Sequence, residues 1–92
     1  MTAAVAERFA VRVMVTDAWD QVFLAAGPEM TVAELKRQAL SRALKQAAPP
    51  LADYIVKFHG AAVLDEATTL AVLGAGANAP FIVLPARRRA VR

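Results

Sequence analysis

The sequence predicts a single α+β domain in which a mixed sheet of four to five strands packs on one main helix. Residues 9–16 alternate apolar side chains with others at a period of two, which is typical of a half-buried strand. Residues 32–46 instead repeat apolar side chains at helical spacing. Residues 81–84 are an uninterrupted apolar run, as expected of a strand in the middle of a sheet. A length of 92 residues suits one such domain.

The first two strands are predicted to form an antiparallel hairpin. Residues 17–20 contain two aspartates that favour a turn, and residues 21–26 form a second, weaker strand. So short a connection requires the two strands to run in opposite directions. The face of the first strand predicted to point inward carries Phe9, Val11, Val13 and Val15.

The main helix is predicted to run from about residue 32 to residue 46. Thr31 is the expected N-cap, and Glu34 stands three residues later, where the partner of a capping box belongs. Two prolines at positions 49 and 50 end the helix. The side chains expected on its solvated side are Lys36, Arg37, Arg42 and Lys45.

The second half of the chain is predicted to return to the same sheet. Residues 54–59 form a third strand, residues 60–62 a turn, and residues 63–64 a very short fourth strand. Residues 70–74 form a short helical turn that Gly74 ends. Because the first and last strands are the most apolar, we expect them to be neighbours in the middle of the sheet.

The domain is predicted to span residues 9–86, between a flexible N-terminus at residues 1–8 and a basic tail at residues 87–92. The net charge is +3, but four of the eleven basic residues lie in the tail: Arg87, Arg88, Arg89 and Arg92. Without them the chain has seven basic and eight acidic residues, so its basicity belongs to the tail. The tail has three interpretations: a solubilising segment, a contact for acidic protein, or a contact for nucleic acid or anionic lipid. No aromatic residue is interleaved with the arginines, which argues against nucleic acid.

The composition excludes several kinds of chemistry, and we expect neither a cofactor nor a catalytic site. The chain contains no cysteine, which rules out disulfides and thiolate chemistry, and His59 is its single histidine. Residues 65–66 are a carboxylate pair in a predicted loop, where solvation is their expected role. No apolar run approaches the roughly 18 residues that a membrane-spanning helix needs, and residues 1–8 lack the pattern of a secretory signal. We therefore expect a cytoplasmic protein.

Several short motifs follow one another in the second half of the chain. In order, they are Lys57-Phe58-His59-Gly60, Val63-Leu64-Asp65-Glu66, Thr69-Leu70 and Leu73-Gly74. The last strand then begins 11 residues after Leu70. This order and spacing resemble the ubiquitin-like β-grasp family over roughly residues 9–87. The resemblance implies a β-grasp fold that binds another protein.

The chain departs from the conjugating members of that family at its C-terminus. Those members end in a Gly-Gly carboxylate, whereas this sequence contains no Gly-Gly pair and ends in the basic tail. It therefore looks more like the small non-conjugating bacterial members, such as those associated with type VII secretion systems or the accessory subunits of multicomponent oxygenases. Two alternatives remain open: a relative of the modifiers and sulfur carriers, and a nucleic-acid-binding adaptor that uses the tail. The sequence identifies neither the partner nor the oligomeric state.

The sheet face turned away from the helix is the predicted partner-binding site. The residues expected on it are Met14, Phe23, Ile82 and Leu84, with Arg12 and Lys57 at the rim. An apolar patch with a basic rim is typical of a protein-binding surface. A shift of one residue in the register of strand 81–84 would turn Ile82 and Leu84 into the core instead. Trp19, at the tip of the first hairpin, either packs on its own hairpin or serves as an exposed anchor.

Overall fold

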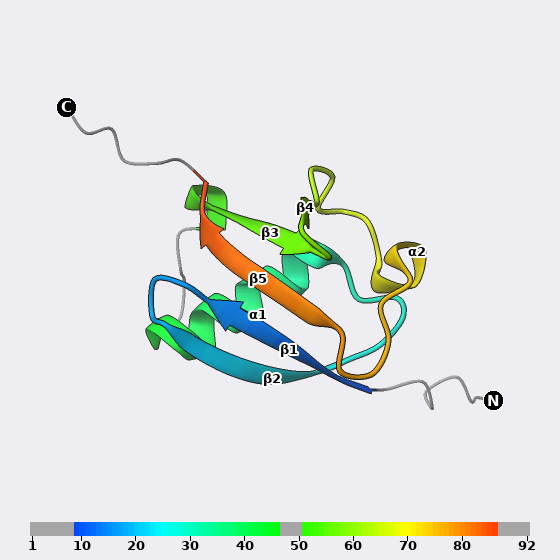
Figure 1. Ribbon diagram of the computed structural model, residues 1–92, viewed down its shortest axis with the longest axis horizontal. Helices are drawn as coiled ribbons and strands as arrows, with labels where there is room; N and C mark the ends of the chain where they lie inside the picture. The colour runs from blue at the N-terminus through cyan, green and yellow to red at the C-terminus, as the bar shows by residue number, and fades with distance from the viewer. Residues whose placement is uncertain (1–8, 47–50, 87–92) are drawn as a thin grey trace.

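The computed structural model describes residues 9–46 and 51–86, which form a two-layer domain with one helix lying across one face of a five-stranded sheet (Figure 1). The predicted segments 1–8 and 87–92 lie outside the described residues. The elements are β1 Phe9–Val15, β2 Asp20–Ala26, α1 Val32–Leu44, η2 Leu51–Asp53, β3 Tyr54–Phe58, β4 Ala61–Ala62, α2 Leu70–Leu73 and β5 Pro80–Pro85. The predicted fold class, with its main helix and its short helical turn, is confirmed.

The sheet is mixed, with the strand order β2-β1-β5-β3-β4. β1 pairs antiparallel with β2 and parallel with β5, while β3 pairs antiparallel with both β5 and β4. The predicted adjacency of the first and last strands is therefore correct. Because β1 and β5 run in parallel, the tip of the first hairpin and the last residues of β5 lie at the same end of the sheet (Figure 1).

The predicted positions of the second turn and of β4 were wrong by about two residues. β4 is Ala61–Ala62, and the turn before it consists of His59 and Gly60, with φ angles of 55° and 83°. Two consecutive residues with positive φ form the tight two-residue hairpin turn whose twist matches that of the strands. The sequence pattern assigned His59 to the end of the third strand and therefore placed the turn around the glycine and after it, because positive φ is uncommon in any residue other than glycine.

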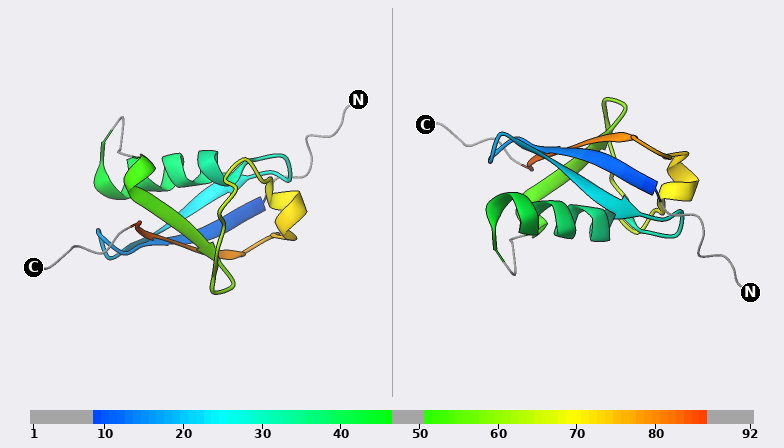
Figure 2. Two further views of the ribbon diagram at one scale, coloured as in Figure 1. Left: turned by 90° about the horizontal axis from the view of Figure 1, so that it is seen from above. Right: turned by 90° about the horizontal axis from the view of Figure 1, so that it is seen from below.

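The two helices cap each other at their N-termini. Each helix donates its first two backbone N–H groups to carbonyls of the loop that precedes the other helix. The four bonds run from Val32 to Thr68, Ala33 to Glu66, Leu70 to Met30 and Ala71 to Pro28, at 2.9–3.0 Å. The first N–H groups of a helix have no partner within it, so this exchange satisfies donors that would otherwise need water. It also fixes α2 against the start of α1 (Figure 2).

The expected capping box at α1 forms only in part. The Thr31 hydroxyl accepts a hydrogen bond from the backbone N–H of Glu34 at 3.2 Å, as predicted for the N-cap. The Glu34 carboxylate, however, accepts hydrogen bonds from Arg37 and Gln38. The hydrogen bond from Arg37, followed by that from Gln38, lowers the pKa of Glu34 to about 2.

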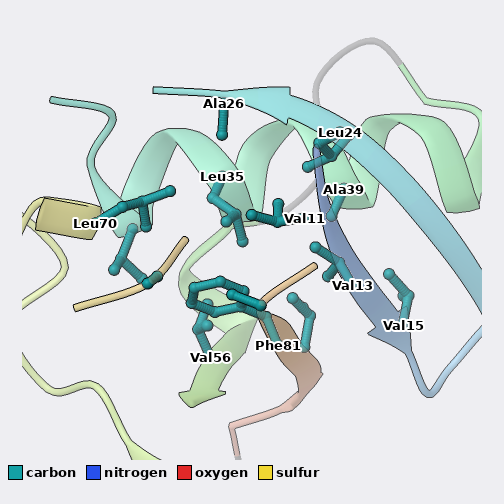
Figure 3. Close-up of a cluster of buried hydrophobic side chains, with 14 of the residues drawn as sticks. Val11, Val13, Val15, Leu24, Ala26, Leu35, Ala39, Val56, Leu70 and Phe81 are labelled. Carbon is teal, nitrogen blue, oxygen red and sulfur yellow. The ribbon is translucent and has the colours of Figure 1, made fainter. Parts of the chain in front are cut away.

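The core lies between α1 and the inner face of the sheet (Figure 3). It contains the inward-facing side chains of β1 and β5, together with the apolar stripe of α1 and Leu70 of α2. Phe81 is the largest fully buried side chain, and its ring stacks on that of Phe58 with a centroid separation of 4.8 Å. The central strands thus supply the core with alternate residues, as their sequence pattern predicted.

Lys36 is buried, whereas the helical pattern placed it on the solvated side. Its side chain is only 4% exposed, and its ammonium donates to the carbonyls of Leu51 and Tyr54 at 2.8 and 2.9 Å. The third partner is the Glu66 carboxylate, at 2.8 Å. A buried ammonium is tolerated when charge pairing and hydrogen bonds replace its water. Lys36 therefore joins α1 to the start of β3 and to the loop before α2.

Candidate protein-interaction surface

Cross-strand register places the predicted partner-binding residues of the sheet on one face. Arg12 lies opposite Phe23, and Met14 lies beside Ile82 on the parallel strand. Ile82 in turn lies opposite Lys57. Residues that face each other across a ladder project on the same side of the sheet. This side is the outer face, opposite α1.

The inner and outer residues of β5 alternate in the way the predicted register requires. Phe81 and Val83 are buried, whereas Ile82 is 40% exposed and Leu84 is half-buried. On β2, Phe23 is 54% exposed. A β5 register shifted by one residue would reverse this pattern, because successive side chains of a strand point to opposite faces.

Ile55 also belongs to this surface, and the sequence-based prediction missed it. It lies opposite Leu84 in the antiparallel pairing of β3 with β5, and it is half-buried. The signal was available, because residues two apart on a strand share a face and Lys57 was already placed outward. We define the outer patch as Met14, Phe23, Ile55, Ile82 and Leu84.

The outer patch has a basic rim. At the strand positions of the outer face, the only charged side chains are Arg12 and Lys57. Arg12 donates through Nε to the carbonyl of Asn78 at 3.4 Å. Within residues 9–46 and 51–86, neither cation has a carboxylate within 4.0 Å. An apolar surface between two cations is suited to a partner that presents apolar and acidic side chains.

Trp19 lies apart from the strand ladder, in the loop between β1 and β2. Its side chain is 80% exposed, so it does not pack on its own hairpin. Its backbone has a φ of 55°, a left-handed conformation that is unfavourable for a bulky residue. The backbone N–H of Trp19 donates to the carbonyl of Thr16 at 3.1 Å, which closes the turn. An exposed tryptophan in this setting adds nothing to the core.

The same loop is tied to β3 through Tyr54. The Tyr54 hydroxyl donates to Oδ2 of Asp17 at 2.6 Å. This hydrogen bond, together with burial, raises the pKa of Tyr54 to about 12, because both favour the neutral phenol. The backbone N–H of Ala86 donates to the carbonyl of Asp53 at 2.8 Å, just before Tyr54. The hairpin loop, the start of β3 and the last residues of β5 are thus joined at one end of the sheet.

The histidine and the carboxylate pair noted in the sequence make contacts that stabilise the fold. His59 lies in the tight turn after β3, with its ring edge-on to Phe58 at a centroid separation of 4.1 Å. Asp65 accepts a hydrogen bond from the backbone N–H of Ala67, and Glu66 pairs with Lys36. Residues 9–46 and 51–86 contain no group of three histidine, cysteine or acidic side chains placed to hold a metal ion. The predicted anion-contact arginines of the tail lie outside the described residues.

No helix in the described part of the chain is long and apolar enough to cross a membrane. The architecture is that of a ubiquitin-like β-grasp domain: a hairpin, a helix across it, and a return that inserts β5 beside β1.

Comparison with solved structures supports this assignment of the fold. The ubiquitin of Caldiarchaeum subterraneum superposes with a TM-score of 0.72 at 17% identity, covering 88% of this chain and 96% of that chain. A ubiquitin-like domain from Arabidopsis thaliana gives 0.73 at 17% identity, covering 99% and 92%. The ubiquitin-like domain of Dsk2 from Plasmodium falciparum gives 0.71 at 19% identity, covering 86% and 99%. No protein-family model and no curated protein matches the sequence. At these identities, the likeness shows a shared fold.

Proposed function

We propose that this chain is a non-catalytic, ubiquitin-like interaction module that binds another protein through the outer patch. The observation that carries the proposal is the exposure of Phe23 and Ile82 on one sheet face, between two cations without a nearby carboxylate in the described chain. Large apolar side chains that gather on one exposed face mark a site of association more often than isolated ones do. Ubiquitin-like domains are, as a class, interaction modules, which agrees with this role.

The chemistry of the surface defines the kind of partner. The apolar centre supplies favourable burial, while Arg12 and Lys57 favour carboxylates at the partner's rim. Trp19 extends the proposed contact to the hairpin tip, because a rigid exposed aromatic loses little conformational entropy on binding. The partner is therefore expected to present an apolar strip flanked by acidic residues.

The test compares charge substitutions of two exposed apolar residues that lie on different surfaces of the domain. Ile82→Glu places a carboxylate in the outer patch, whereas Val72→Glu places one on α2, away from that face. Affinity-tagged chains are returned to the source cells, and the proteins that co-purify are quantified. The wild-type chain and Val72→Glu are expected to retain the same partner, and Ile82→Glu to lose it. Retention of that partner by Ile82→Glu, with an unchanged melting temperature, would refute the assignment of the outer patch.

The proposal includes a cytoplasmic, accessory role without conjugation to other proteins, as in the bacterial members the sequence resembles. Its support is the absence of a Gly-Gly pair from the 92 residues and the presence of Pro85 at the end of β5. The assay is incubation with ATP and a ubiquitin-type activating enzyme. We expect no covalent adduct by mass spectrometry, whereas an adduct through the C-terminal carboxylate would instead establish a modifier or carrier.

A further inference from the structure

The sheet has one long open edge in the described structure, along β2. β4 forms the opposite edge but contains only two residues, whereas β2 contains seven. An open edge is a template for pairing with another strand, and proteins usually protect it with charges, prolines or bulges. Residues 21–26 carry neither a charge nor a proline, and Asp20 at the start of β2 is its single charged residue.

The backbone groups that face this edge follow from the pairing of β1. The carbonyl of Ala10 accepts from the N–H of Asn78 at 2.7 Å, and the N–H of Arg12 donates to the carbonyl of Ala79 at 3.0 Å. The backbone of these β1 residues is therefore directed toward β5. In an antiparallel pair, opposite residues alternate between hydrogen-bonded and non-hydrogen-bonded positions. In a non-hydrogen-bonded position, the backbone N–H and C=O groups of both residues point away from the partner strand.

The partners of these β1 residues on β2 must therefore direct their own backbone groups outward. Ala10 lies opposite Ala25, Arg12 opposite Phe23, and Met14 opposite Gln21. The N–H and C=O groups of Gln21, Phe23 and Ala25 thus face the open edge. They form a set of donors and acceptors in the spacing that another strand requires.

One of these groups is covered by a side chain from the helix. Arg42, in the last turn of α1, donates through Nη1 to the carbonyl of Phe23 at 3.0 Å. α1 lies along β2 on the inner side of the sheet (Figure 2), which brings the guanidinium to the middle of the edge. Arg42 has no other hydrogen bond or ion pair within residues 9–46 and 51–86.

We propose that β2 is a self-pairing edge that Arg42 holds closed, and that the strand it excludes is β2 of a second copy of this chain. A two-fold axis at Phe23 would place Gln21 of one copy opposite Ala25 of the other, and the two Phe23 residues opposite each other. On the inner side, Val22 would lie opposite Leu24. No two like charges of β2 itself meet in this register, because Asp20 lies opposite Ala26, so the strand can pair with a copy of itself.

Arg42 opposes this pairing because it bonds the Phe23 carbonyl, which would lie at the centre of the ladder between the two copies of β2. The two Phe23 residues would exchange backbone hydrogen bonds, and each exchange requires the carbonyl that a guanidinium already occupies. Two charge-assisted hydrogen bonds must therefore break for one dimer to form. Their removal is expected to strengthen self-association by about tenfold or more.

The test measures sedimentation velocity of the full chain over a wide concentration range. The variants are Arg42→Met, which removes the donor, and Arg37→Met, which removes the same charge from the same helix but leaves the edge covered. The wild-type chain and Arg37→Met are expected to sediment as monomers. Arg42→Met is expected to form a dimer at concentrations where Arg37→Met does not.

A second substitution identifies the surface used by the dimer. The N–H of Ala25 faces the open edge, so Ala25→Pro blocks strand pairing without removing a β1–β2 hydrogen bond. The double variant Arg42→Met/Ala25→Pro should return to a monomer with native circular dichroism. Three results would overturn the proposal: a monomeric Arg42→Met, a double variant that still dimerises, or a wild-type chain that dimerises as tightly as Arg42→Met.

Discussion

Replacement of Lys36 by methionine tests how much the buried ammonium contributes to stability. The aliphatic stem of lysine and the methionine side chain are similar in length, so packing along the stem is largely retained. What disappears is the ammonium, with its bonds to the carbonyls of Leu51 and Tyr54 and to the Glu66 carboxylate. The perturbation is therefore mainly electrostatic, and its size follows from the groups left without a partner.

The expected fall in the free energy of unfolding is the sum of three lost interactions. Each partly buried carbonyl left without a donor costs about 1 kcal/mol, at the low end of the range for such groups. The Glu66 carboxylate loses its ion pair but is 27% exposed and regains water, which limits its contribution to about 1 kcal/mol. We expect Lys36→Met to lower the free energy of unfolding by about 3 kcal/mol. For a domain of this size, that corresponds to a fall in melting temperature of roughly 10–20 °C.

The assay is urea unfolding followed by circular dichroism, with thermal unfolding as a second measurement. Arg37→Met is the matched control, because its partner Glu34 is exposed and the pair lies on the helix surface. Its effect on the free energy of unfolding is expected to be small, because an exposed ion pair is screened by water. A loss below about 1 kcal/mol in Lys36→Met, or a loss no larger than that of Arg37→Met, would refute the reasoning.

Three further predictions concern other parts of the molecule. Because the pKa of Tyr54 is raised above its usual value, the stability that its neutral form contributes is complete below about pH 10 and is lost as the pH rises toward 12. Phenolate absorbance of this single tyrosine should titrate near pH 12, and Tyr54→Phe should reduce the alkaline loss; a midpoint near 10 would contradict the hydrogen bond to Asp17. Trp19→Gly relieves the left-handed backbone and should raise the free energy of unfolding by about 0.5 kcal/mol in urea titrations, whereas a loss would mean that the indole stabilises the fold. Leu70→Ala should cost about 3 kcal/mol in the same titrations, while the exposed Leu64→Ala should change little, and equal effects would refute the assignment of Leu70 to the core.

Most of the fold could be predicted because the central strands and the main helix carry regular patterns. Alternation in residues 9–16 fixed which side chains of β1 enter the core, and the apolar run at 81–84 indicated a central strand. These patterns reflect burial on one face, which is the strongest constraint on a small domain. The positions of Met14, Phe23, Ile82 and Leu84 on the outer face followed from the same alternation.

Features that depend on tertiary partners were not accessible in the same way. The helical pattern could not show that Lys36 meets two carbonyls and Glu66, because those groups are 15 to 30 residues away in sequence. The exchange of caps between the two helices likewise joins loops that are distant in the chain. The shift of β4 arose because His59, which the pattern assigned to the third strand, adopts a positive φ and belongs to the turn. Such contacts are decided by packing, which a periodic pattern does not encode.

The contacts that stabilise the domain lie on a different side of the sheet from the outer patch. The buried ammonium of Lys36, the exchanged helix caps and the core all lie on the side of α1. The strand ladders depend on backbone groups, so an outward side chain contributes to them only through its neighbours on that face. A charge at Ile82 should therefore leave the fold intact while it alters the chemistry of the face. This separation makes the comparison of Ile82→Glu with Val72→Glu a test of binding rather than of stability.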